Sequence, residues 1–395
     1  MKLMSNLKKK QICAAIICGL MFMGGHAEAA VDLYGAYNGD IENVNGAAIT
    51  DPSDLMDSNI RSEKADFTVT GGEWKNIYGG YGATGYIQNN AVTISGGTVV
   101  NNNVYGGFVA GGTATQNTVT ITGGTVNGNV IGGWTSTNTA SGNNVIIAGG
   151  EVKGNVYGGY ANTVPSTVSG NTITLGDMNN PDRYAQITRN VYPNAVYMTT
   201  FSMDGALFGG TVNVYNTGNT IGGYLSALGT QGSEDEPPIL STINFYINAA
   251  DMDATGSKIM LNVANEASVG GNTTICAGVR NVGSVKAGDR ITLLQAGTFE
   301  VKSNTNYKTM SSDGIMKVDL DFKLYKGDSE VPITTTEKLA NGKIIAIAKN
   351  DGTADLGPDS AAKSPVETMA ASVSLINAGA DMMAGEAMTG AAQST

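Results

Sequence analysis

Hydrophobic and polar positions alternate along the first half of the chain, and each alternating run stops at a glycine doublet. The segments "VTISGG" (92–97), "VTITGG" (119–124) and "VIIAGG" (145–150) place apolar residues two and four positions before the doublet. A period of two with β-branched residues predicts a short strand with one buried and one solvated face. A second alternating segment follows each doublet, as in Val126 and Val130 or Val152 and Val156. Each period thus predicts two short strands and a variable polar stretch.

One phrase recurs in this region, as "KNIYGGY" (75–81), "NNVYGGF" (102–108), "GNVIGGW" (128–134) and "GNVYGGY" (154–160). Its glycine doublets start at intervals of 27, 26 and 26 residues, which gives a period of about 26. A short strand with one apolar face cannot bury that face alone, but stacked coils join such faces into a continuous interior. The repeat therefore predicts an all-β fold, a right-handed parallel β-helix (solenoid) with coils of about 26 residues, plus a short C-terminal α-helix. The handedness is taken from general knowledge of such folds.

Three kinds of residue are kept in each copy of the phrase. The glycines are predicted to adopt positive φ at corners where a Cβ would clash. The asparagines are predicted to form a ladder of side-chain amides between coils, and the aromatics a column of stacked rings. We interpret all three as structural, with ligand binding as the alternative. The corner glycines are Gly79, Gly106, Gly132 and Gly158; the asparagines are Asn76, Asn103, Asn129, Asn155 and, more distantly, Asn190; the aromatics are Tyr81, Phe108, Trp134 and Tyr160.

Composition divides the chain into segments. Residues 1–29 combine Lys8, Lys9 and Lys10 with an apolar stretch and "AEA" (27–29), which predicts an export signal peptide cleaved after Ala29; an uncleaved anchor helix is the alternative. Residues 30–66 are predicted to form an N-terminal cap and 67–230 the solenoid repeats. After an acidic, proline-containing break (232–240), alternation without a fixed period predicts a β segment over 241–350 that caps the solenoid, followed by a linker over 351–363.

The tail has a helical pattern over residues 364–390. Ser364, Pro365 and Glu367 form a predicted capping box with proline at the first helical position. A helix from there to residue 385 would be about 30 Å long, close to the hydrocarbon thickness of a bilayer. Because it contains Glu367, Asn377 and Asp381 among mostly small residues, it suits a narrow protein pore better than lipid. The alternative is an ordinary amphipathic helix packed on the solenoid.

Together, the signal peptide, the glycine- and asparagine-rich repeats, "VKAGDRITLLQAG" (285–297) and "SPVETMAASVSLINAGADMMAG" (364–385) resemble the passenger region and pore linker of an autotransporter of the type V secretion family. The resemblance covers nearly the whole chain. It implies display of the passenger on the surface of a diderm bacterium, with the linker inside an outer-membrane β-barrel. The chain departs from the family pattern, since no alternating ten-residue strands follow "GAAQST". We therefore expect a barrel partner in trans or on a neighbouring reading frame, or else a truncated remnant held in the periplasm.

The composition argues against several kinds of catalysis. The only histidine, His26, lies in the predicted signal peptide, so the mature chain has no imidazole for a catalytic triad or a histidine metal site. Cys276 is the only cysteine after cleavage and is expected to be a small buried hydrophobe without a disulfide. Glu151 and Lys153 are predicted to form a weak surface pair rather than a catalytic set.

Charge narrows the possible partners. The chain has a net charge of −11, and cleavage of the predicted signal peptide would leave 19 basic and 33 acidic residues, which makes nucleic acid an improbable partner. The acidic runs at 233–236 and 327–330 lack the spacing of a calcium loop, and solvated charge is the favoured interpretation. We predict no catalytic, cofactor-binding or metal residues. The expected function is adhesion or another cell-surface interaction with a glycan or protein by a non-enzymatic displayed or secreted passenger. The alternative is a carbohydrate-active β-helix enzyme, a lyase or glycosidase.

Overall fold

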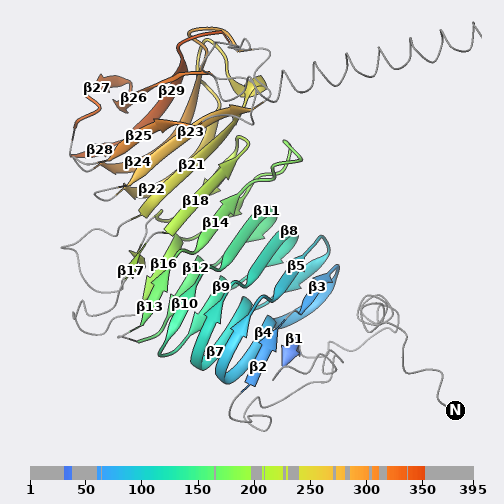
Figure 1. Ribbon diagram of the computed structural model, residues 1–395. Helices are drawn as coiled ribbons and strands as arrows, with labels where there is room; N and C mark the ends of the chain where they lie inside the picture. The colour runs from blue at the N-terminus through green and yellow to red at the C-terminus, as the bar shows by residue number, and fades with distance from the viewer. Residues whose placement is uncertain are drawn as a thin grey trace, which may run out of the picture.

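The computed structural model describes residues 31–37, 60–63, 65–163, 166–196, 207–208, 210–225, 228–229, 240–269, 273–280, 285–301, 305–310, 318–335 and 337–351. These residues form a parallel β-solenoid with roughly 28 residues per turn (Figure 1). A short 3-10 helix, η3 (Ala249–Asp251), lies between two strands. The predicted signal peptide, nearly all of the predicted linker, and the tail helix with its cap at Ser364, Pro365 and Glu367 lie outside the described residues.

Each turn contributes a strand to a surface that we call face A. Inward-pointing residues of these strands pair in register from coil to coil, and their side chains are almost fully buried. The strands of face A are β3 (Asp66–Val69), β5 (Ala91–Ile94), the first half of β8 (Thr118–Val126) and of β11 (Asn144–Val152), β14 (Thr172–Leu175), β18 (Gly210–Tyr215), β21 (Leu240–Asn248), β23 (Thr274–Arg280) and β25 (Asn306–Thr309).

Two further faces complete the turn. Face B is formed by the start of β4 (Gly72–Gln88), β6 (Thr98–Val100), the second halves of β8 and β11, β15 (Gln186–Ile187), β19 (Asn219–Ile221), β22 (Ile259–Val269) and β24 (Arg290–Val301). Face C is formed by β1 (Val31–Tyr37), the middle of β4, β7 (Val104–Thr115), β9 (Val130–Thr135), β12 (Val156–Ala161), β16 (Val191–Val196) and β20 (Leu228–Gly229).

An arm extends from face C before the chain returns to face A. It contains β2 (Ile60–Glu63), the ends of β4 and β7, β10 (Thr139–Ser141), β13 (Thr167–Ser169) and β17 (Leu207–Phe208). Ile87, Val109 and Ala114 form a small apolar cluster in the arm, separate from the main core. The main core is continuous along the axis, as the alternating pattern predicted. Its face A members include Phe67, Val92, Val119, Val145, Ile173, Val212, Ile243 and Ile275.

The parallel stack extends further than the predicted boundaries. Residues 210–309 continue face A through β18, β21, β23 and β25, although consecutive partners such as Ile173, Val212 and Ile243 are no longer about 26 residues apart. Only the region from β26 onward closes the end of the stack: β26 (Leu320–Lys326), β27 (Ser329–Val331), β28 (Lys338–Ala340) and β29 (Gly342–Ala348) pair antiparallel with one another and with β24. At the other end, β1 and β2 pair in parallel with β4, so the described part of residues 30–66 belongs to the stack.

Candidate functional site

The predicted role of the phrase glycines is wrong in its mechanism. Gly79, Gly106, Gly132 and Gly158 lie inside the strands of face C and do not have positive φ. Glycine is required at these positions because an added Cβ would overlap a carbonyl oxygen of the next coil. A Cβ on Gly106, for example, would lie 2.5 Å from the carbonyl oxygen of Gly132. Glycines that do have positive φ occur in the preceding doublet of each period, at the corner between faces A and B. These are Gly72, Gly97, Gly124 and Gly150.

The predicted asparagine column forms a hydrogen-bonded ladder whose donors are mainly backbone groups. The backbone N–H of Asn103 donates to Asn76 Oδ1 at 3.0 Å, and that of Asn129 donates to Asn103 Oδ1 at 2.8 Å. The same bond continues to Asn155 and Asn190. The asparagine side chains therefore provide hydrogen-bond acceptors for backbone N–H groups at the corner between faces B and C.

The predicted aromatic column is stacked. The ring centroids of Tyr81 and Phe108 are 5.1 Å apart, and those of Phe108 and Trp134 are 4.2 Å apart. Tyr160 pairs in register with Trp134 on the following coil. A second column, which the sequence pattern did not single out, contains Tyr78, Tyr105, Tyr157 and Tyr192.

The two aromatic columns meet edge to face. Tyr81 follows Tyr78 by three positions, so in a straight strand the two rings would lie on opposite faces. Their ring centroids are nevertheless 5.1 Å apart. The strand therefore bends at the glycine doublet and turns both rings to the same side. These rings form a cluster of their own outside the main core. Burial raises the pKa of Tyr157 to about 12. Because the rings largely cover one another, the columns are packing elements.

A second asparagine ladder is buried beneath the glycine doublets and was missed at the sequence level. Asn143 Oδ1 accepts from the backbone N–H of Asn117 at 3.0 Å and from its Nδ2 at 3.1 Å, and Asn143 Nδ2 donates to Asn171 Oδ1 at 3.0 Å. A Cβ at Gly133 would overlap the Asn143 amide. The signal was an asparagine directly before each of the four face A strands β5, β8, β11 and β14. The ladder consists of Asn90, Asn117, Asn143, Asn171 and Asn194.

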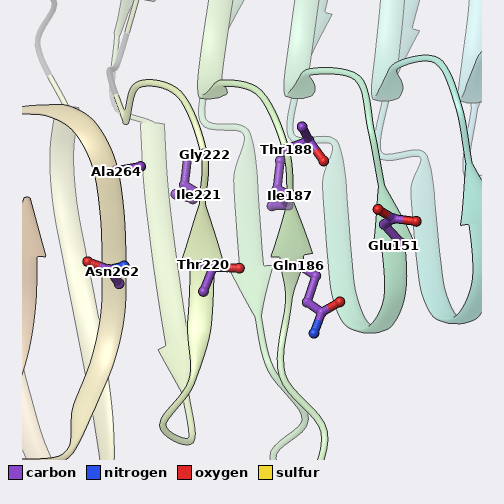
Figure 2. A pocket seen from close by; sticks show the side chains of 9 residues that line it. All are labelled: Glu151, Gln186, Ile187, Thr188, Thr220, Ile221, Gly222, Asn262 and Ala264. Carbon is purple, nitrogen blue, oxygen red and sulfur yellow. The ribbon is translucent and has the colours of Figure 1, made fainter.

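An open hollow of about 280 Å³ lies on face B (Figure 2). One side is a column of polar side chains on successive coils, and the other includes Gly222 and Ala264, whose small size creates the space. A neighbouring hollow of about 410 Å³ shares Thr220 and Asn262, so that the two form one groove along the axis. The polar column consists of Glu151, Gln186, Thr220, Asn262 and Gln295, each in register with the next.

The groove contains few charged groups. Among the described residues that line the smaller hollow, only Glu151 is ionisable, and it forms the predicted pair with Lys153 at 3.9 Å, with both side chains about half exposed. The described lining of the larger hollow has one ionisable residue, Lys258, which pairs with Asp251 at 2.7 Å. The groove therefore offers mainly amide and hydroxyl groups to a ligand.

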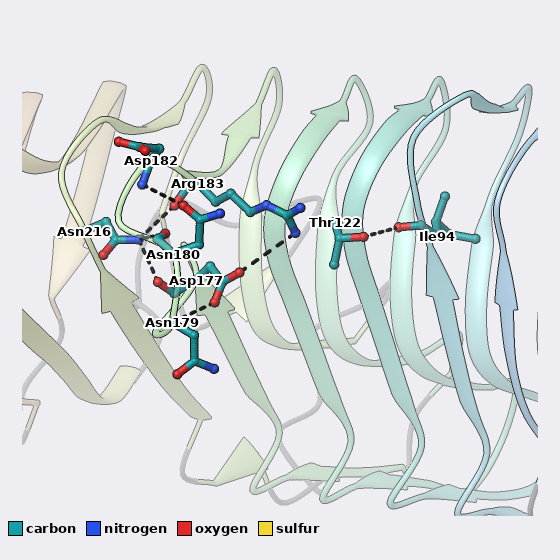
Figure 3. Close-up of polar contacts among 8 residues, drawn as sticks. All are labelled: Ile94, Thr122, Asp177, Asn179, Asn180, Asp182, Arg183 and Asn216. Atoms are coloured by element: carbon teal, nitrogen blue, oxygen red, sulfur yellow. Dashed lines mark hydrogen bonds and ion pairs between the residues drawn. The ribbon is translucent and has the colours of Figure 1, made fainter.

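The loop between β14 and β15 is tied down before the chain enters the groove at Gln186 (Figure 3). Asn216 Nδ2 donates to the carbonyl oxygens of Asp177, Asn180 and Arg183 at 2.7–2.9 Å. Arg280 Nη2 also donates to the carbonyl oxygen of Met178 in this loop at 2.9 Å. These contacts fix the approach to the polar column without adding a charge to its lining.

The remaining predicted groups do not assemble into a site. Cys276 is buried, as expected, and burial raises the pKa of its thiol. In the run at 327–330, Asp328 pairs with Lys343 and Glu330 with Lys323, whereas the run at 233–236 lies outside the described residues. Among the described residues, no three His, Cys, Asp or Glu side chains are grouped so that they could hold a metal ion. In the same part of the chain no helix has the length and apolarity to span a membrane.

Comparisons with known proteins add no relative. No family model, no curated protein and no solved structure matches the chain.

Proposed function

We propose that this protein is an exported, non-enzymatic passenger that is displayed on or released from the cell surface and binds a glycan or an extended protein segment in the face B groove. The observation that carries the proposal is the polar column, in which Gln186, Thr220 and Asn262 present amide and hydroxyl groups on consecutive coils. Because coils repeat at about 4.8 Å, a repeating ligand that runs along the axis can bond successive rungs.

The chemistry of the groove favours binding over cleavage. Glycosidases of the usual kind use two carboxyl groups on opposite sides of the scissile bond. Within the part of the chain that the structure describes, the lining of the smaller hollow has one carboxylate, Glu151, which already faces Lys153. A carbohydrate-active enzyme therefore stays the weaker hypothesis. If Glu151→Gln abolished turnover of a purified polysaccharide, the enzyme hypothesis would replace ours.

The binding proposal is tested with arrays of oligosaccharides and peptides. We expect the wild-type chain to bind a subset of either array, and we expect Thr220→Arg/Asn262→Arg to lose that binding because two long charged side chains would fill the shared part of the groove. Thr137→Arg/Asn138→Arg, at two exposed positions in the arm, is the matched control. Equal binding by the groove variant and the control would remove the groove from the proposal.

Display is tested separately, on intact cells. We propose that residues 364–390 link the solenoid to an outer-membrane pore supplied by a partner, a hypothesis that rests on the sequence pattern alone. The solenoid should then be cleaved by added protease on intact cells, and Ser374→Pro should reduce that cleavage because proline costs about 3 kcal/mol inside a helix. A solenoid that is protected on intact cells and cleaved only after lysis would contradict surface display.

A further inference from the structure

Face A carries two columns of short side chains that point to solvent. In the first column Thr118, Asn144, Thr172, Thr211, Thr242 and Thr274 pair in register from coil to coil. In the second column the corresponding residues are Thr120, Ile146, Thr174, Asn213, Asn244 and Cys276. The coil before these adds Ala91 and Thr93. The columns lie two residues apart on each strand, so they form a two-dimensional array on one face.

The array is regular over this whole length. The register shifts of the strands involved fall outside it, after Ile147 and before Thr211. Its members are half-buried, apart from the buried Cys276, because each shields its neighbours while it still faces solvent. Asn244 Nδ2 donates to Asn213 Oδ1 at 2.9 Å, which fixes the amides of adjacent coils relative to each other. Threonine is stiff at χ1, so these side chains lose little freedom when a ligand covers them.

The array is uncharged, although the chain is acidic. From Ala91 to Cys276 neither column contains an ionisable side chain except that thiol, and charges appear only beyond its ends, at Asp66 and Lys308. The chain as a whole has a net charge of −11. A polyanion would be repelled by that net charge, and a polycation would find no carboxylate inside the array. Charge therefore favours a neutral partner.

We propose that face A is a second binding surface, which adsorbs the flat side of an uncharged, hydroxyl-rich polysaccharide. Pyranose chains present C–H groups on the faces of their rings and hydroxyls at the edges, and threonine offers a methyl group and a hydroxyl together. Each contact is weak, but the array repeats it over several coils, so the contacts add as multivalent binding does. The proposal concerns a different face from the groove and stands independently of the groove's ligand.

The experiment is co-sedimentation of the full chain with two insoluble uncharged polysaccharides, microcrystalline cellulose and chitin. We expect binding to at least one of them at both low and high salt, since screening does not weaken contacts between uncharged groups. Thr118→Lys/Thr120→Lys should reduce the bound fraction roughly tenfold, because two charges would have to be desolvated against the polymer. Thr137→Lys/Asn138→Lys, which adds the same charge at two exposed positions in the arm, should leave sedimentation unchanged.

A second, more conservative variant distinguishes loss of binding from loss of the fold. Thr118→Val/Thr120→Val keeps the β-branched shape and removes only the hydroxyls, and it should also weaken binding while its circular-dichroism spectrum stays that of the wild type. The proposal is overturned if neither polysaccharide binds, if high salt releases the protein, or if the face A variant and the control variant in the arm bind equally. Light scattering that shows a dimer dissociated by Thr118→Lys/Thr120→Lys would reassign the face to a contact between two copies. Depression of ice growth that is lost in the same variant would reassign it to an ice lattice.

Discussion

Glycine doublets and buried asparagine side chains pack together as one repeated unit in this solenoid. The strand of face C bends at each glycine doublet, and the space left by the missing side chains is filled by an asparagine amide from the start of the next face A strand. At Gly132 an added Cβ would lie 3.0 Å from Asn143 Cβ and would overlap the carbonyl oxygen of Gly158. Neither neighbour can withdraw easily, because one belongs to a buried ladder and the other to the backbone of the adjacent coil.

The first prediction compares two glycines of one coil. Gly132→Ala should lower the free energy of unfolding by about 3 kcal/mol, as overpacking against backbone does. Gly142→Asn should cost less than about 1 kcal/mol although Gly142 has φ +62, because the equivalent corner residues Asn89 and Gln116 adopt φ 58 and 56. Urea unfolding of both variants measures the difference. Equal midpoints would show that the packing beneath the doublet is looser than the structure indicates.

The second prediction concerns tyrosines and pH. Burial raises the pKa of Tyr157 and of Tyr307 to about 12, so each favours the neutral, folded form. This contribution to stability is fully present below pH 10 and is lost as the pH rises towards 12, so the melting temperature should fall in that range. Tyr307→Phe should be neutral or stabilising at pH 7, because the Tyr307 hydroxyl is buried and has no hydrogen-bond partner among the described residues. In this variant the melting temperature should also fall less steeply between pH 10 and pH 12 than in the wild type. A clear loss of stability at pH 7 would contradict this.

At the scale of strands, the asparagine contacts between coils differ in burial and therefore in importance. The ladder through Asn143 is almost fully buried, and its amides bond to side chains and backbone of the coils on both sides. An exposed contact, from Asn127 Nδ2 to Asn101 Oδ1, spans 3.4 Å at the surface. Water can replace the exposed bond but has no access to the buried one.

The third prediction follows from this difference. Asn143→Ala should destabilise the protein by about 3 kcal/mol or more, since it removes the side-chain acceptor of the Asn117 backbone N–H and one of the two donors to Asn171 Oδ1 in a dry interior. Asn127→Ala should stay within about 0.5 kcal/mol of wild type. Chemical denaturation of the two variants measures both values. If Asn143→Ala were as stable as Asn127→Ala, water would have to enter the ladder.

The strands also show why the sequence predicted the stack better than the groove. Val119 and Ile121 recur at a fixed spacing, and that spacing predicts their stacking. Gln186 and Thr220 come from coils whose lengths have become irregular, and they share no motif, so only the register of the folded chain brings them together. The phrase glycines were found by their repetition, but their φ angles depend on the neighbouring coil, which a local pattern does not contain.

At the scale of the whole molecule, the stack must end without leaving a sheet edge that can recruit other chains. The described C-terminal end is closed by β29, which pairs antiparallel with both β24 and β26. Ile344 of β29 is fully buried and pairs with Leu294 and Leu324. The cap is therefore the element on which solubility of the solenoid should depend most directly.

The last prediction tests that dependence. Ile344→Asp would place an unpaired carboxylate in the core of the cap and should cost about 4 kcal/mol, enough to detach β29 from β24 while the distant coils keep their own contacts. Ala340→Asp adds the same charge at an exposed position of β28 and should change stability by no more than about 0.5 kcal/mol. We expect the first variant to form high-molecular-weight, thioflavin-binding species in size-exclusion chromatography, and the second to elute with the wild type. Because the coils contact mainly their neighbours, the far-ultraviolet spectrum of the first variant should keep most of its β signal. A monomeric Ile344→Asp protein would mean that the edge of β24 is protected by something other than β29, whereas complete unfolding would mean that the solenoid folds as a single cooperative unit.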